Sequence, residues 1–121
     1  GELLEFPMAA VGDGLFRLPV SGGGYFRLLP YWLTRAGLRH LNGKGRAFPF
    51  YMHPWEVDPD QPRMSEASAL SKFRHYRNLD QTEGRLRRML GEFRFGRMDA
   101  MAAHARDAAP QLQAGDLARA A

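Results

Sequence analysis

The 121-residue sequence contains no cysteine, which excludes disulfides, thiolate metal sites and cysteine nucleophiles. No stretch approaches the ~20 consecutive apolar residues that a transmembrane helix needs, so we expect no membrane span. The first ten residues, GELLEFPMAA, carry acids where an export signal needs positive charge, and we therefore expect a cytoplasmic protein. The chain begins with Gly rather than Met, which suggests a piece of a longer protein.

The composition that is present, 45% hydrophobic and 25% charged, is typical of a globular domain. The formal net charge of +4 is uneven, because residues 63–98 hold nine basic and four acidic residues. Such a surplus can attract a polyanion, but no nucleic-acid-binding motif accompanies it. Several of these arginines fall on the solvent face of a predicted helix, so we expect no nucleic-acid partner.

The pattern of apolar, glycine and proline residues predicts an α/β fold with some parallel strand pairing. In chain order, we expect strands at 2–9 and 14–20, a helix at 26–41, a strand at 47–53, a loop through 54–62, mixed helix and loop at 65–79, a helix after Asp80, a short strand at 93–95 and a helix at 98–108. No linker divides the sequence. We therefore expect one domain over 1–109 and a frayed tail at 110–121.

Two of the predicted helices carry an apolar face. Pro30 is tolerated only in the first turn of the helix at 26–41, and Asn42-Gly43 ends it. Asp80 and Glu83 have the spacing of a capping box at the start of the later helix. The residues expected to face the interior are Phe26, Leu29, Trp32, Leu33 and Ala36, and then Leu86, Met89, Leu90 and Phe93; Arg85, Arg87, Arg88 and Glu92 are expected mainly on the opposite, solvent-facing side.

The densest cluster of chemically active residues is the segment Tyr51-Met52-His53-Pro54-Trp55-Glu56. A histidine where a strand opens into a loop occupies the usual place of a site in α/β folds, and histidine transfers protons near neutral pH. Glu56 can orient or charge-stabilise it, and Trp55 can supply an apolar wall. The alternative is a histidine satisfied by backbone, with the tryptophan in the core.

Eight of the fourteen aromatic residues fall within residues 25–55, and aromatic faces suit sugar rings. Tyr25, Tyr51 and Trp55 are the better surface candidates, whereas Trp32 and three phenylalanines (Phe26, Phe48 and Phe50) are more easily explained as core. Arg74 stands in a polar and aromatic cluster with the next two residues, from which it could reach a substrate. Such a cluster is more often surface structure.

Other familiar sites are absent from the sequence. The glycines Gly22, Gly23 and Gly24 lack the spacing of a phosphate-binding or dinucleotide-binding loop, so we interpret them as a structural loop with a positive φ or a close approach to another group. No two histidines have the spacing of a helical or finger-type zinc pair. We therefore expect no metal ligand within this chain.

Three segments, SGGGYFRLLPY, FYMHPWEVDPDQPR and KFRHYRNLDQTEGRLRRMLGEFRF, together resemble the C-terminal portion of exosortase-associated (PEP-CTERM system) polysaccharide deacetylases, which act in bacterial exopolysaccharide biosynthesis. These hydrolases belong to the NodB-homology carbohydrate esterases, and the resemblance covers roughly residues 1–100. It implies a deformed (β/α) barrel, of which this chain would be the second half. It also implies a divalent metal, commonly zinc, that activates water to remove acetyl groups from N-acetylated sugars.

The resemblance implies a role for each candidate residue. FYMHPWE is similar to the family's last motif, which makes His53 the general acid for the leaving amine. Tyr25, Trp55, Glu56 and Arg74 would then lie near the sugar. The Asp-Asp pair and His-x-x-x-His that hold the family's metal are absent here, so the ligands would lie in a missing N-terminal half, and this chain alone should be inactive. The alternative is a non-catalytic carbohydrate-binding or interaction module.

Overall fold

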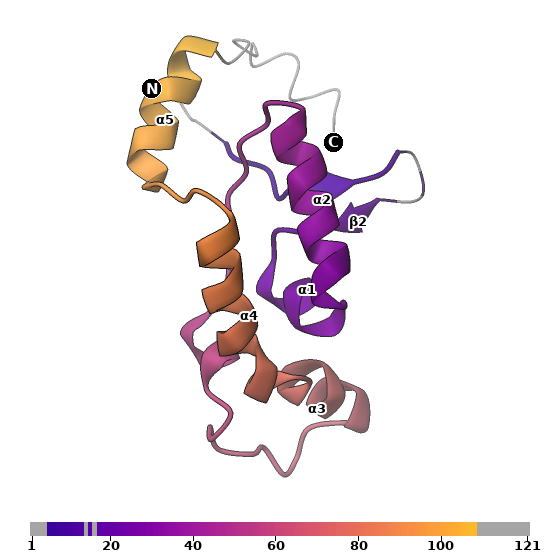
Figure 1. The fold of residues 1–121 in the computed structure, drawn as a ribbon. Coiled ribbons are helices and arrows are strands. Elements are labelled where there is room, and N and C mark those ends of the chain that lie inside the picture. Colours follow the sequence, from indigo (N-terminus) through magenta and orange to yellow (C-terminus); the bar gives the residue numbers. More distant parts are fainter. Residues whose placement is uncertain (1–4, 14, 16, 109–121) are drawn as a thin grey trace, which may run out of the picture. The chain divides into compact units, whose positions relative to one another are not determined.

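The computed structural model describes residues 5–13, 15 and 17–108, and the chain divides into two units (Figure 1). One unit spans Phe6–Arg94, and the other combines residues 1–5 with 95–121. Within the second unit, helix α5 (Met98–Ala108) has the predicted bounds. The whole predicted tail at 110–121 and residues 2–4 of the predicted strand at 2–9 lie outside the described residues.

An N-terminal hairpin forms, but its first strand lies between the predicted strands at 2–9 and 14–20, and its second strand is short. Strand β1 (Ala10–Val11) pairs antiparallel with β2 (Leu18–Pro19), in the register Ala10 to Pro19 and Val11 to Leu18. The pairing does not extend back to residue 5, because Pro7 lacks an amide hydrogen and the Ala9 amide donates instead to the Ser21 hydroxyl at 2.8 Å. The predicted strand at 2–9 is therefore wrong over its described residues 5–9, and within the described part of 14–20 only Leu18–Pro19 is a strand.

The single helix predicted at 26–41 is two helices, α1 (Gly23–Leu28) and α2 (Tyr31–Gly43). Pro30 separates them, because its ring cannot follow a continuing helical turn. The break rotates the apolar stripe, so the buried residues of α2 are Thr34, Gly37, Leu38 and Leu41. Trp32, predicted to be core, is 66% exposed. The predicted stop at Asn42-Gly43 is confirmed.

The second half of the unit holds a 3-10 helix, η1 (Pro54–Val57), and helices α3 (Ala69–Tyr76) and α4 (Leu79–Glu92). Helix α4 begins after Asn78, whose φ of 55° is left-handed, so the predicted cap at Asp80 is wrong. Met89 is buried as predicted, whereas Leu90 is 52% exposed. The segment predicted as a strand at 93–95 is not one, because Phe93 closes α4 by donating its amide to the Met89 carbonyl.

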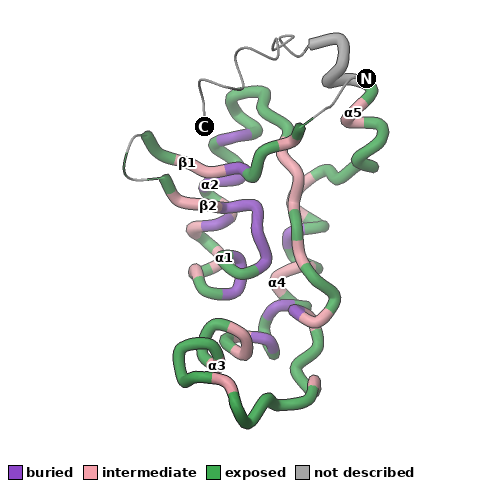
Figure 2. The backbone as a smooth tube through the Cα atoms, turned by 180° about the vertical axis from the view of Figure 1, so that it is seen from behind, coloured by how far each residue is buried: buried purple, intermediate pink, exposed green. Residues whose placement is uncertain are grey.

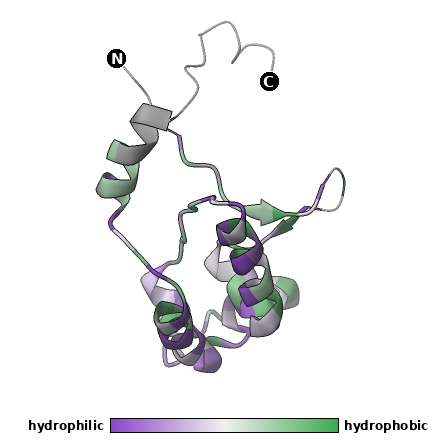
Figure 3. Cartoon of the chain, turned by 45° about the horizontal axis from the view of Figure 1, so that its top comes forward, coloured by the Kyte–Doolittle hydropathy of each residue, from purple (hydrophilic) through white to green (hydrophobic). Residues whose placement is uncertain are grey.

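The core of the larger unit brings together the hairpin, α1, α2 and α4. Phe26 lies at its centre with no exposed surface, and its ring meets those of Phe50 and Tyr31 edge to face at 5.2 and 6.2 Å. The other buried apolar residues in this cluster are Ala9, Val20, Leu38, Leu41 and Met89. Figure 2 shows burial concentrated in the segment that leads into α1 and in stripes of the helices. The helices carry both hydrophilic and hydrophobic residues (Figure 3), as amphipathic packing requires. The unit is mixed helical with a small two-stranded sheet, compatible with the α/β class.

An arginine of α4 caps the C-terminal end of α1. The Arg85 Nη1 donates to the carbonyls of Phe26, Arg27 and Leu29, each at 3.1 Å. The last carbonyls of a helix have no partner within the helix, and a cation there is also favoured by the helix dipole. Arg85 is therefore a structural link between α1 and α4, and its prediction as a solvent-face residue is wrong.

A carboxylate at the end of α4 ties this helix to α2. Glu92 accepts from the Arg88 Nε at 2.8 Å, from Arg35 and from the Tyr31 hydroxyl at 3.2 Å. The Arg88 hydrogen bond is the largest of the effects that lower the pKa of Glu92, to about 2. Burial, followed by the adjacent Glu92 charge, raises the pKa of Tyr31.

We expect Glu92→Gln to lower the melting temperature at pH 7 but not near pH 2. A carboxyl whose folded pKa is depressed stabilises the fold above its unfolded pKa, near 4.5, and loses that effect as the pH falls toward 2. Thermal unfolding followed by circular dichroism between pH 2 and 7 measures the difference. Glu83→Gln on the exposed face of α4 is the control, and equal curves for the two variants would contradict the role of Glu92.

Candidate functional site

The segment predicted as a strand at 47–53 is extended but pairs only once. Tyr51 forms an isolated parallel bridge with Gly22, in which the Tyr51 amide donates to Ser21 and the Gly23 amide donates to Tyr51, at 2.9 and 2.8 Å. This bridge supplies the parallel pairing expected from the sequence. It brings the histidine segment to the start of α1, although 29 residues separate the two bridged residues.

His53 immediately precedes η1, and its imidazole is exposed. The Tyr51 hydroxyl lies 2.6 Å from His53 Nε2, and the two rings meet edge to face at 4.8 Å. The backbone around His53 is fixed from within η1, because its amide donates to Glu56 Oε2 at 2.9 Å and its carbonyl accepts from the Glu56 amide at 3.0 Å. The His53 imidazole is therefore exposed to solvent, while the backbone that bears it is fixed.

Glu56 is buried and paired with Arg27, with each side chain 3% exposed. The Arg27 Nε donates to Glu56 Oε1 at 3.0 Å. Because Oε2 accepts from the His53 amide, both carboxylate oxygens are occupied inside the fold. Glu56 thus holds the His53 backbone and does not contact its ring. Its predicted place at the sugar surface is wrong.

Arg27 connects three helices through the same guanidinium. Beyond Glu56 in η1, its Nη1 donates to three carbonyls at 3.1, 2.8 and 3.3 Å. Two belong to Arg74 and His75 in the last turn of α3, and the third to Arg77, the residue that follows the helix. No spacing in the sequence distinguishes Arg27 from the other arginines. Its role depends on partners that are 29 to 50 residues away.

The three glycines do not form a loop. Gly22 is the residue before α1, and Gly23 and Gly24 form its first turn. None of them has a positive φ, which occurs at Gly12 and Gly45 instead. The alternative expectation, a close approach, is confirmed at Gly23, where an added Cβ would lie 2.0 Å from Glu56 Oε2.

We expect Gly23→Ala to destabilise the protein by about 1–3 kcal/mol, because the new methyl overlaps a carboxylate held by Arg27 and cannot be accommodated without strain. Gly24→Ala is the matched control. A Cβ there meets nothing within 4 Å, and alanine favours a helix over glycine by up to about 1 kcal/mol. Urea unfolding of both variants measures the difference. Equal stabilities would show that the Glu56 side chain moves aside.

Five aromatic rings form a continuous row of contacts across the candidate site. The Trp55 ring is nearly parallel to those of His75 and His53, at 4.2 and 5.7 Å between centroids. Tyr51 and Tyr76 add edge-to-face contacts at its two ends. The Arg27 guanidinium also lies 5.0 Å from the Trp55 centroid. These neighbours cover much of the indole ring, and Trp55 is only partly exposed.

An open hollow of about 620 Å³ lies between α1, η1 and α3. Its lining consists of Gly24, Tyr25, Arg27, Leu28, Trp55, Ser71, Arg74 and His75. The structure therefore brings together three predicted sugar-surface residues, Tyr25, Trp55 and Arg74. His53 does not line the hollow but stacks on Trp55 beside it.

The orientation of His75 is fixed by a residue that the sequence did not suggest. The Gln61 amide nitrogen donates to the carbonyls of Trp55 and Asp58, both at 2.8 Å. Its oxygen must then be the acceptor that faces His75 Nε2 at 2.7 Å, which places a hydrogen on that nitrogen. The Gln61 side chain thus binds both the Trp55 backbone and the His75 ring, and so fixes the position of one relative to the other.

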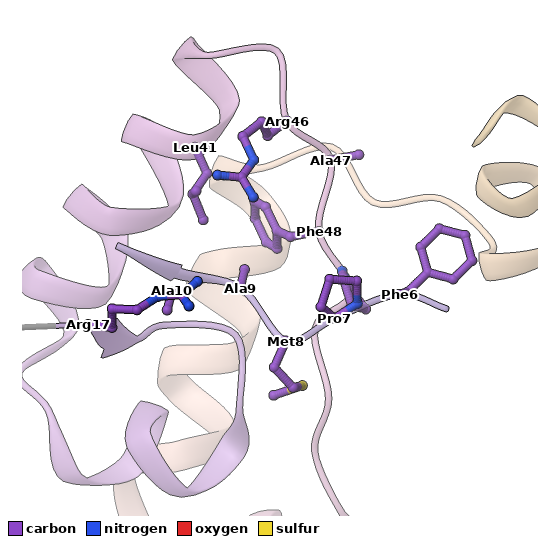
Figure 4. A pocket seen from close by; sticks show the side chains of 11 residues that line it. Phe6, Pro7, Met8, Ala9, Ala10, Arg17, Leu41, Arg46, Ala47 and Phe48 are labelled. Atoms are coloured by element: carbon purple, nitrogen blue, oxygen red, sulfur yellow. The ribbon is translucent and has the colours of Figure 1, made fainter. Parts of the chain in front are cut away.

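A second, smaller cavity of about 120 Å³ lies beside the hairpin (Figure 4). Apolar side chains such as Met8, Leu41 and Phe48 line it, together with Arg17 and Arg46. It contains no histidine or carboxylate, so it offers no group for acid–base chemistry near neutral pH. The hollow beside His53 is the better candidate site.

Within the described ranges, no three His, Asp or Glu side chains gather where a metal ion could be held. The residues present therefore do not fit the metal that the resemblance implies. None of the helices that the structure describes has the length and apolar character needed to cross a lipid bilayer.

A family model, described as the domain of unknown function DUF3473, matches residues 1–103. No curated protein and no solved structure matches the chain significantly.

Proposed function

The chain belongs to the DUF3473 family, and from this premise we propose that it is the C-terminal part of a metal-dependent polysaccharide deacetylase. The family's association with polysaccharide deacetylases of PEP-CTERM systems supports the proposal, as does the motif resemblance of the sequence. In this proposal the chain is the second half of a deformed (β/α) barrel. The parallel bridge between Gly22 and Tyr51 is the pairing expected of such a barrel.

The observation that carries the proposal is the placement of His53. Its imidazole is exposed on a backbone held by Glu56, next to a hollow that contains aromatic and cationic side chains. A general acid must reach the leaving group while its orientation is maintained.

In the proposed reaction, water adds to the acetyl carbonyl of an N-acetylated sugar, the C–N bond breaks, and acetate and a free amine leave. The His53 imidazolium supplies the proton that the amine nitrogen requires. The Tyr51 hydroxyl lies 2.6 Å from Nε2 and 3.3 Å from Nδ1, so it helps to orient the ring. In this proposal, the group that activates the water is held by residues outside this chain.

Release of acetate from N-acetylated chito-oligosaccharides by the full-length protein tests the proposal. We expect acetate and free amine to appear in equal amounts. Oligosaccharide binding measured by calorimetry, with no acetate released from any N-acetylated substrate, would overturn the enzymatic function. That result would favour the second candidate, a carbohydrate-binding module, which is supported by the aromatic lining of the hollow.

A further inference from the structure

The hollow carries positive charge and no negative charge. Two of its lining residues are arginines and a third is a histidine, and none is Asp or Glu. Arg27 is neutralised by its buried partner Glu56. Arg74 is exposed and takes part in none of the ion pairs formed by the described residues, so its guanidinium is available to a ligand.

The backbone of Arg74 is also held in place. Its carbonyl accepts from Arg27 at 3.1 Å, and the next residue, His75, is stacked on Trp55 and bonded to Gln61. The flexible part is thus limited to the Arg74 side chain itself. Tyr25, which is 46% exposed and belongs to α1, also lines the hollow. The hollow therefore offers an incoming sugar ring both an aromatic surface from α1 and a cation from α3.

We propose that this hollow is a subsite for a sugar that bears a carboxylate, so that the polysaccharide is acidic. The inference rests on the proposed function only in taking a polysaccharide as the ligand. A guanidinium recognises a carboxylate with two parallel hydrogen bonds, and Tyr25 provides a face for the apolar side of the pyranose ring. A neutral sugar offers this guanidinium only hydroxyl acceptors, which bind it less strongly than a carboxylate does.

Size agrees with this assignment. A volume of about 620 Å³ accommodates one or two sugar rings, within the usual range of 300–1,000 Å³ for ligand pockets. His53 lies beside the hollow, across Trp55. The acidic sugar would therefore neighbour the N-acetylated sugar at His53 and would set the register of the chain at the general acid.

Isothermal titration calorimetry with two oligosaccharides tests the subsite without requiring turnover. A hyaluronan octasaccharide alternates glucuronate with N-acetylglucosamine, whereas the chito-octasaccharide contains only the neutral sugar. We expect the full-length protein to bind the acidic oligosaccharide roughly ten- to hundred-fold more tightly at low salt, the range of a charge-assisted hydrogen-bonded pair. Arg74→Gln should remove this preference and leave the neutral oligosaccharide little affected.

Arg39→Gln is the matched control, because Arg39 is exposed on α2, lines neither cavity and loses the same charge. It should retain the preference. Equal affinity of the wild type for the two oligosaccharides, or an equal loss in both variants, would overturn the inference. Equally tight binding of a polyglutamate peptide would also overturn it, by showing attraction to any polyanion. Acetate release is measured separately, so failure of the subsite and failure of the proposed function are distinguishable.

Discussion

Replacement of His53 by alanine is expected to lower kcat for acetate release by about 10²–10⁴-fold in the full-length protein. Without the imidazole, the leaving amine must take its proton from water. Because the His53 side chain does not line the hollow, KM should change far less than kcat. Steady-state measurement of acetate release over a range of oligosaccharide concentrations separates the two parameters.

His40→Ala is the control for this experiment, since His40 is an exposed histidine on α2, away from η1. Its kcat should remain within about two-fold of the wild type, as expected for a surface substitution. An unchanged kcat in His53→Ala would contradict the general-acid assignment. A rise in KM alone would reassign His53 to substrate binding.

Replacement of Glu56 by alanine is expected to destabilise the fold by about 3–5 kcal/mol. The change leaves Arg27, whose side chain is 3% exposed, as a buried charge without its carboxylate. It also removes the acceptor for the His53 amide. Chemical denaturation with urea measures the loss, and catalytic activity should fall with it because the backbone of His53 is no longer held.

Glu83→Ala is the matched control, because its partner Arg87 is 76% exposed and a surface ion pair contributes no more than about 1 kcal/mol. Glu56→Gln keeps an acceptor of the same shape and should therefore lose less than Glu56→Ala. This variant remains informative if the alanine variant does not fold. A loss below about 1 kcal/mol in Glu56→Ala would show that water replaces the carboxylate.

The sequence predicts well where one local rule decides the outcome. The end of α2 at Gly43 and the bounds of α5 each depend on residues close together in the chain. Pro30 is the instructive failure. A proline is compatible with the first turn of one helix and also with a break between two, and only the break explains why Trp32 is exposed.

The candidate site also has a part that the sequence could predict and a part that it could not. The position of His53 at the end of an extended segment, beside Trp55, could be predicted because neighbours in sequence remain neighbours in space. The burial of Glu56 could not, because it depends on Arg27 and on the missing side chain of Gly23. His75 was grouped with Arg74 in the sequence, but its stack on Trp55 requires α3 to return against η1.

The arginine contacts at the ends of α1 and α3 have a consequence for the order of folding. Helix α1 has six residues and α3 has eight, and isolated helices of such length do not persist in water. Arg85 of α4 binds carbonyls at the end of α1, and Arg27 of α1 binds carbonyls at the end of α3. We expect neither helix to form early, and both to appear together with the docking of α4, so that the hollow between them assembles in one cooperative step.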